Sequence, residues 1–284
     1  MMKPIVVCLI FICASIQSSG RQQINVMTFN IRYHNNYDSL NGWDYRKSKL
    51  CSQIHFHDVD VLGVQEALYD QMQDLKSCLP EYEAIGVGRE DGKEKGEYAA
   101  IFVQKSKFKV IKSGTFWLSE TPAVAGSKSW DAALTRICTW AEVENKMDHK
   151  KIFLFNTHFD HVGRVARSQS GHLIVHYIDS IAGKEPAILT GDLNSTPQEE
   201  AVAAILDPNN ICKLLDAKSI SIEAHYGPTG TFNAFQEHET SNEPIDYIFV
   251  TPNFKVLKHA TLSQSWQGRF SSDHFPVFAC LSLN

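Results

Sequence analysis

Short apolar runs with the spacing of β-strands recur along almost the whole chain, and segments with helical spacing separate them. Residues 24–31 alternate between apolar and polar side chains and are rich in strand formers. Residues 164–181 carry apolar side chains at helical spacing, and the apolar run 187–190 leads into Gly191-Asp192. No linker rich in Pro, Gly or Ser interrupts this pattern, so we expect one α/β domain.

Length and composition are sufficient for one large core, and further strands and helices can be predicted from the same apolar spacing. The chain has 284 residues, of which 43% are hydrophobic. Several apolar runs end in a polar side chain, and in α/β folds the loops that bind ligands gather at strand ends. We expect further strands at 59–65, 98–103, 108–114, 136–143, 151–157, 245–250 and 277–281, and further helices at 45–56, 70–79 and 199–206.

Residues 1–20 differ from the rest and predict a secretory signal peptide. Lys3 is their only charge, an apolar stretch follows at 5–16, and small residues lead to Gly20. The apolar stretch is shorter than the roughly 20 residues that span a bilayer. We therefore expect export to a periplasmic or extracellular location, with 21–284 as the mature domain and no transmembrane segment after cleavage.

Two other interpretations of this segment remain open. The apolar stretch is also compatible with a buried N-terminal helix or strand. A lipoprotein anchored through Cys13 is a weaker alternative, because the bulky Phe11 and Ile12 precede that cysteine.

Charge and cysteine content exclude some classes of function. The formal net charge is −5 and becomes −6 without Lys3, which argues against a long basic track for duplex nucleic acid. The five cysteines beyond the signal have no CxxC spacing, so a zinc site built from cysteines is not supported. An odd number cannot all pair within one chain, and we expect buried free thiols.

Polar side chains at the strand ends form a candidate catalytic set. Asp192 and Asn194 follow a buried strand through Gly191, where a glycine allows a tight turn. Asp273-His274 places a carboxylate beside an imidazole, Glu66 ends another strand, and Asn30 interrupts an apolar one. Oxygen ligands without thiolates suit Mg²⁺, with Mn²⁺ as a substitute, better than zinc.

The order of these residues resembles the endonuclease/exonuclease/phosphatase superfamily, which includes deoxyribonuclease I, abasic-site endonucleases, inositol polyphosphate 5-phosphatases and neutral sphingomyelinases. The resemblance covers nearly all of residues 24–282. It rests on Thr28-Phe29-Asn30-Ile31-Arg32, Gln65-Glu66, Asn156-Thr157-His158-Phe159-Asp160, Gly191-Asp192-Leu193-Asn194, Ile245-Asp246-Tyr247-Ile248 and Ser272-Asp273-His274-Phe275-Pro276. Further stretches resemble a bacterial branch of exported metal-dependent hydrolases: Asn41-Gly42-Trp43, Gly96-Glu97-Tyr98, Phe116-Trp117-Leu118-Ser119-Glu120 and Thr231-Phe232-Asn233.

This resemblance implies a four-layer α/β sandwich, in which two packed mixed β-sheets are flanked by helices. It also implies a metal site in which Glu66 is the main carboxylate, Asn30 a ligand or ligand-orienting amide, and Asp273 a neighbour of the metal. Asp192 would activate the attacking water, and Asn194 would hold that water or a phosphoryl oxygen.

The resemblance assigns the remaining roles to charged groups around the phosphate. His274, oriented by Asp246, would contact the phosphate or act as an acid or base. His158 would be the second phosphate-facing histidine, paired with Glu97, and each carboxylate would favour the protonated form of its ring. Arg136 would bind a non-bridging phosphate oxygen, to which its fork geometry is suited.

Two tryptophans are candidates for lining the substrate cleft. Trp43 and Trp117 lie in polar, loop-like segments, although tryptophans more often pack in cores.

The expected reaction is in-line attack of water on phosphorus in a phosphate diester or monoester. A nuclease acting on DNA or RNA is the first alternative, which the acidic net charge disfavours. A non-catalytic phosphate-binding protein on the same scaffold is the second. A monomer is expected.

Overall fold

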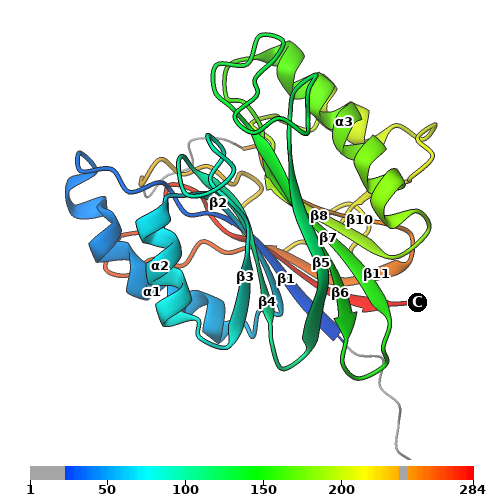
Figure 1. The fold of residues 1–284 in the computed structure, drawn as a ribbon. Helices are drawn as coiled ribbons and strands as arrows, with labels where there is room; N and C mark the ends of the chain where they lie inside the picture. Colours follow the sequence, from blue (N-terminus) through cyan, green and yellow to red (C-terminus); the bar gives the residue numbers. More distant parts are fainter. Residues whose placement is uncertain (1–22, 237–241) are drawn as a thin grey trace, which may run out of the picture.

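The computed structural model describes residues 23–236 and 242–284, so the expected signal peptide at 1–20 lies outside the described residues. Two six-stranded β-sheets pack face to face, and helices cover their outer faces (Figure 1). The expectation of a four-layer α/β sandwich is thereby confirmed.

The first sheet joins the two ends of the described chain. Its centre is β1, which pairs in parallel with β2 and antiparallel with β12. In spatial order its strands are β11 (Phe254–Thr261), β12 (Val277–Leu283), β1 (Gln23–Asn30), β2 (Val61–Ala67), β4 (Tyr98–Gln104) and β3 (Tyr82–Ile85). The sequence pattern did not predict β3 or β11, both of which lie at edges, where fewer side chains need be apolar.

The second sheet is built from the middle of the chain. Parallel pairing of β7 with β8 combines with antiparallel pairing elsewhere, so this sheet is mixed as well. In spatial order its strands are β5 (Phe108–Trp117), β6 (Ile137–Asn145), β7 (Lys151–His158), β8 (Ala187–Asp192), β10 (Asp246–Val250) and β9 (Leu215–Asp216). The two-residue strand β9 was not predicted, because it is too short to show any periodicity.

Helices cover the outer face of each sheet. In Figure 1, α1 and α2 lie against the first sheet and α3 lies against the second. The helices are α1 (Trp43–Phe56), α2 (Tyr69–Cys78), α3 (Arg164–Ala182) and α4 (Glu200–Leu206), with one short 3₁₀ turn (Ser39–Asn41) before α1. Within the described ranges, the structure has no helix that is long and apolar enough to cross a membrane.

Alternation along the central strands creates three separate apolar clusters. In β1, Ile24 and Val26 pack between the sheets, whereas Met27 and Phe29 pack under α1 and α2. In β7, Leu154 packs between the sheets, while its neighbours Phe153 and Phe155 face α3 and α4. Both faces of each central strand are therefore buried, as expected for strands covered on both sides.

A polar layer follows the apolar layer between the sheets. Asn156 of β7 donates hydrogen bonds to the backbone oxygens of Val64 and Ala100 in the opposite sheet, both at 2.9 Å. Its Oδ1 accepts from Gln65 Nε2 at 2.6 Å and from Thr190 Oγ1 at 2.9 Å. One buried side chain thus connects four strands across the interface.

Gly63 is required at this layer. A Cβ at residue 63 would lie 2.2 Å from Thr190 Oγ1 and 2.6 Å from Asn156 Oδ1, which is closer than Cβ atoms approach other heavy atoms in proteins. The absence of a side chain therefore allows the polar layer to form at this separation of the sheets.

The expectation of buried free thiols is wrong for two of the five cysteines beyond residue 20. Cys51 of α1 and Cys78 of α2 form a disulfide. The helical faces that these cysteines occupy come together only when both helices pack on the first sheet, so spacing alone could not reveal the pair. Cys138, Cys212 and Cys280 are free and buried, as expected.

We predict that Asn156→Leu destabilises the fold by about 3 kcal/mol or more, because it removes four buried hydrogen bonds, those to the backbone oxygens of Val64 and Ala100 and those from the side chains of Gln65 and Thr190. Urea unfolding at neutral pH measures this loss. The exposed Asn209→Leu is the control and should change stability by less than about 0.5 kcal/mol. Equal stability of Asn156→Leu and wild type would show that the polar layer does not hold the sheets together.

Candidate active site

The predicted site residues meet at one end of the sandwich, directly above the polar layer. They surround a cavity of about 470 Å³. The cavity receives side chains from both sheets: Arg32, Tyr33, Glu66, Glu97, Leu134, Arg136, His158, His161, Asp192, Asn194, Phe232, Asp273 and His274. The sequence therefore identified most of the wall, and the fold brings residues from distant parts of the chain together.

Glu66 reaches the cavity because β2 is irregular at this residue. The pairing register of β2 with β4 shifts between Gln65 and Ala67, and Glu66 has a φ of 67°. A bulge of this kind turns a side chain away from the regular alternation, and such backbone strain is common at functional sites. The amide of Tyr33 donates to Glu66 Oε2 at 3.1 Å and fixes the carboxylate.

Asn30 links the two sheets at the floor of the cavity. Its Nδ2 donates to Glu66 Oε1 at 3.0 Å and to Asp192 Oδ2 at 2.9 Å. Asn30 thus orients two carboxylates from opposite sheets, and its role as a metal ligand or ligand-orienting amide stays a prediction.

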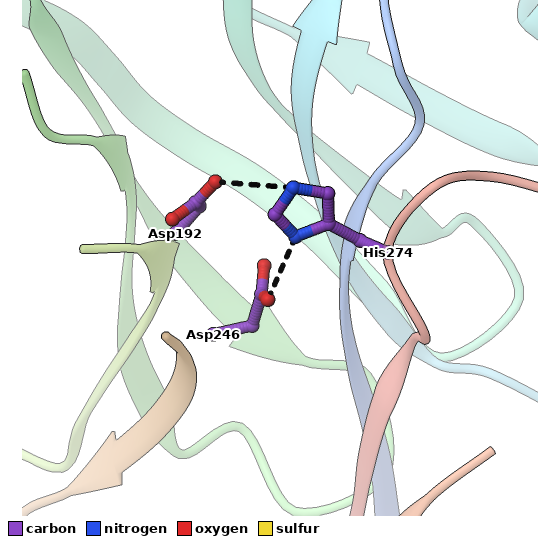
Figure 2. Close-up of side chains that lie close together, drawn as sticks. All are labelled: Asp192, Asp246 and His274. Carbon is purple, nitrogen blue, oxygen red and sulfur yellow. Dashed lines mark hydrogen bonds and ion pairs between the residues drawn. The ribbon is translucent and has the colours of Figure 1, made fainter. Parts of the chain in front are cut away.

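His274 lies between two carboxylates, as Figure 2 shows. Its Nδ1 is 2.9 Å from Asp246 Oδ2, and its Nε2 is 3.8 Å from Asp192 Oδ2. Burial alone would lower the pKa of His274, but the two carboxylates outweigh burial and raise this pKa well above its ordinary value. Burial and the neighbouring Asp246 charge raise the pKa of Asp192 to about 7.

His158 has a different environment from the one expected. We expected Glu97 to orient His158 and favour its protonated form, but Arg136 Nη1 lies 2.9 Å from His158 Nδ1, and Glu97 Oε2 is 3.8 Å away. A guanidinium can only donate, so Nδ1 must be unprotonated. Burial and the positive charges of Arg136 and Arg89 lower the pKa of His158 well below its ordinary value, so the ring is neutral.

Glu97 instead pairs with arginines. Its Oε2 lies 2.5 Å from Arg89 Nη1 and 3.6 Å from Arg136 Nη1. Arg136 also reaches His161 Nδ1 through Nη2 at 3.3 Å. Arg136 therefore holds two histidines in place, and its contact with a phosphate oxygen stays a prediction.

Asn194 and Asp273 complete the set. Asn194 has a φ of 45°, and its side-chain amide lies 3.0 Å from His158 Nε2. Asp273 is buried, and its Oδ2 lies 3.7 Å from Arg32 Nε. Both side chains face the cavity, as the sequence motifs indicated.

Neither tryptophan lines this cavity, so the expectation for Trp43 and Trp117 is wrong. Trp43 is 1% exposed, packs under the first sheet, and donates to Asp74 Oδ2 at 2.8 Å. Trp117 is 6% exposed and donates to the backbone oxygen of Arg89 at 2.6 Å. Both rings are buried. The prediction failed because polar neighbours in sequence do not determine which way a side chain points.

Two basic wall residues, Arg32 and His161, had no role assigned to them from the sequence. Arg32 belongs to a quoted motif, but only the loop after β1 shows that it faces the carboxylates of the site. His161 lies beyond the end of β7, and no sequence signal separates it from an ordinary surface histidine.

The carboxylates of this cavity fit a divalent cation. Burial and the negative charge of Glu66 raise the pKa of Asp273, a repulsion that a bound cation would relieve. Asp192, Asp246 and His274 also have ligand atoms within 4.8 Å of one another and could hold a metal. Because both ring nitrogens of His274 already face carboxylates, the side of the cavity with Glu66 and Asp273 suits an oxygen-seeking cation better.

Comparisons with known proteins agree with this geometry. A model of the endonuclease/exonuclease/phosphatase family matches residues 27–274. A solved endonuclease/exonuclease/phosphatase from Bacteroides vulgatus is 43% identical, with 93% of this chain and 100% of that one covered and a TM-score of 0.89. A mannosyl-6-phosphatase from Bacteroides thetaiotaomicron is 37% identical, with 92% and 100% covered and a TM-score of 0.86.

A more distant likeness concerns the fold alone. The human nocturnin catalytic domain with bound sulfate is 21% identical, with 92% of this chain and 94% of that one covered and a TM-score of 0.72.

Asp160 organises one wall of the cavity through backbone hydrogen bonds. Its Oδ1 accepts from the amides of Val162 at 3.0 Å and Gly163 at 2.7 Å, and its Oδ2 accepts from Leu134 at 2.9 Å. Burial opposes ionisation, but these bonds outweigh it and lower the pKa of Asp160 to about 2 from an ordinary 3.8.

We predict that Asp160→Asn lowers stability at pH 7 by roughly 1–2 kcal/mol, a value reduced for solvent screening. Because the folded pKa is the lower one, this stabilisation is complete well above pH 3.8 and is lost as the pH falls towards 2. Urea unfolding from pH 7 to pH 2 should show the two proteins converging in acid. A constant difference at all pH values would exclude the ionised carboxylate as the cause, and the exposed Asp148→Asn is the control.

Proposed function

The chain belongs to the endonuclease/exonuclease/phosphatase family, and we propose that it is a divalent-metal-dependent phosphatase acting on a small phosphorylated sugar. Members of this family are hydrolases that act on phosphoesters. One observation carries the proposal. The Asp192 carboxylate lies between neutral His158 and positively charged His274, at the floor of a compact cavity.

Asp192 is suited to activate water. A base works best when its pKa lies near the working pH, and the pKa of Asp192 is raised to about 7. The side chain of Asn30 donates to Asp192 Oδ2 at 2.9 Å, and the backbone amide of Asn194 donates to Asp192 Oδ1 at 2.8 Å. The carboxylate is therefore fixed in direction before any substrate binds.

The two histidines would then have separate tasks. Protonated His274, held by Asp246, can donate from Nε2 to a phosphoryl oxygen or to the leaving oxygen. Neutral His158 accepts a hydrogen bond from Arg136 at Nδ1, and its Nε2 already faces Asn194 Nδ2 at 3.0 Å and Asp192 Oδ2 at 3.5 Å, so it is a poor acid. This division assigns proton donation to His274.

A divalent cation, when bound, would neutralise charge on the phosphoryl oxygens. Glu66 and Asp273 would hold it, with Asn30 orienting the Glu66 carboxylate. Mg²⁺ with Mn²⁺ as a substitute is the proposed identity, because the donor atoms are carboxylate oxygens.

The size and charge of the site favour a small monoester. A cavity of about 470 Å³ can hold one phosphorylated sugar ring, and the net charge of −5 argues against a long basic track for a nucleic acid backbone. The 37% identity to a mannosyl-6-phosphatase points in the same direction. The likeness to nocturnin, at 21% identity, shows the fold alone and does not bear on the substrate.

A substrate panel with purified protein tests the proposal. Mannose 6-phosphate, glucose 6-phosphate, inositol phosphates, bis-p-nitrophenyl phosphate and single-stranded DNA should be assayed with Mg²⁺, with Mn²⁺ and with EDTA. We expect metal-dependent phosphate release from the sugar phosphates. Turnover of DNA alone would support a nuclease, and metal binding without turnover of any ester would support a binding protein.

We predict that Asp192→Asn lowers kcat on the best substrate of this panel by about 10²- to 10⁴-fold, because the amide cannot take a proton from water. Circular dichroism should confirm that the variant is folded. The matched control Asp148→Asn, in the exposed turn between β6 and β7, should retain wild-type kcat. Near-normal turnover by folded Asp192→Asn would contradict the assigned role.

We also propose that residues 1–20 are a cleaved export signal. The disulfide between Cys51 and Cys78 supports this, because such bonds persist mainly outside the reducing cytosol. Mass spectrometry of the protein from a cell envelope or culture medium fraction should find an N-terminal peptide beginning near residue 21. An intact Met1 peptide on the active protein in the cytosol would contradict export.

A further inference from the structure

Arg46 of α1 is a charged side chain that the proposed chemistry does not use, although it is only 1% exposed. Its guanidinium donates four hydrogen bonds, all to backbone oxygens. Nη1 reaches Ile31 O and Ser271 O, both at 2.8 Å, Nε reaches Asn41 O at 2.5 Å, and Nη2 reaches Arg32 O at 3.3 Å.

These oxygens belong to the segments that carry the catalytic set. Ile31 and Arg32 directly follow Asn30 at the end of β1. Ser271 directly precedes Ser272, Asp273 and His274, more than 200 residues later in the chain. The two hydrogen bonds of Nη1 therefore connect the loop that follows Asn30, at the end of β1, to the loop that presents Asp273 and His274.

The surroundings of Arg46 are built for a guanidinium. The group lies over the Trp43 ring at 5.5 Å and the Phe235 ring at 5.4 Å, both within cation–π distance. Among the described residues no carboxylate oxygen lies within 4 Å of it, so its charge is balanced only at longer range, by Asp273, Asp38 and Glu66. A buried charge without a close counter-ion is costly and is retained where it has a specific task.

We propose that Arg46 is a positioning residue, which fixes the loop after β1 against the loop of Asp273 and His274 and so sets the distance between the metal-side carboxylates and the catalytic histidine. The proposal rests on the phosphatase function proposed above. It also accounts for the Asn41-Gly42-Trp43 motif, whose tryptophan does not line the active-site cavity. Asn41 supplies a backbone oxygen to Arg46, Gly42 is the N-cap residue of α1, and Trp43 supplies one of the two rings.

A lysine could not do this work. Arginine presents five N–H donors in a rigid planar fork, whereas lysine has three donors on one rotatable ammonium. Arg46→Lys keeps the charge and most of the volume but can satisfy the oxygens of Ile31 and Ser271 only by shifting one loop. The effect should therefore appear in catalysis and metal affinity more than in substrate binding, because Arg46 does not line the active-site cavity.

The experiment compares wild type, Arg46→Lys and Arg46→Met with the core variant Ile178→Ala. Ile178 lies in α3 against the outer face of the second sheet, so its truncation lowers stability without touching either loop. For each protein we would measure the melting temperature without metal, Mn²⁺ binding by electron paramagnetic resonance, and kcat and KM on the best substrate of the panel. Mn²⁺ binding gives a readout that does not depend on turnover.

We expect Arg46→Lys to be folded, with kcat about 10- to 100-fold lower, KM changed less than threefold and Mn²⁺ bound several-fold more weakly. Arg46→Met should lose more on both measures, and Ile178→Ala should lose stability alone. Wild-type kcat and Mn²⁺ affinity in folded Arg46→Lys would overturn the proposal. Failure of both Arg46 variants to fold would overturn it too, because Arg46 would then serve the fold rather than the site.

The failure of the proposed function would look different. If wild type hydrolyses no ester of the panel, the phosphatase assignment fails, while weaker Mn²⁺ binding in Arg46→Lys would still support the positioning role. If wild type is active and Arg46→Lys matches it in both readouts, only the positioning role fails.

Discussion

The hydrogen bonds of Asn156 across the interface of the two sheets are the interaction on which the rest of this structure depends. Apolar packing between two sheets is not directional and does not by itself fix how one sheet sits on the other. The amide of Asn156 is directional, and it joins β7 to the backbone of β2 and β4 and to Thr190 of β8. The relative position of the sheets is therefore set by hydrogen bonds that a small slip would break.

The catalytic set lies one pleat beyond this layer on the same strands. Residues two apart in a strand point to the same face, so Asn156 is followed by His158, Thr190 by Asp192, and Thr28 by Asn30. Fixing the polar layer thus fixes the distance between carboxylates from opposite sheets. Glu66 is the exception, because the bulge after Gln65 turns it into the cavity out of alternation. The site depends on regular strands for most of its groups and on one strained residue, Glu66, for the carboxylate that we propose as the main metal ligand.

Electrostatic balance in the site depends on the arginines that lie beside its carboxylates and histidines. Arg136 and Arg89 surround Glu97 and keep His158 neutral, while Asp246 and Asp192 keep His274 charged. The two histidines of the cavity therefore differ in charge. His158 is neutral and His274 is positively charged, because their nearest charged neighbours have opposite signs. Arg46 and Arg32 offset the acidic side in the same way, near Asp273. The charge of each histidine thus depends on the residue that contacts its Nδ1, which is Arg136 for His158 and Asp246 for His274, and the sequence motif around the histidine does not reveal that partner.

The sequence by itself determined the architecture and most of the residues that line the candidate site, because alternation along each strand and the polar residue at its end are local properties of the chain. Tertiary structure decided what no local pattern records. It turned Trp43 and Trp117 into the core, paired Cys51 with Cys78, and placed Arg136 rather than Glu97 on His158. These outcomes depend on contacts between residues far apart in sequence, and such contacts arise only when the two sheets pack and their loops converge.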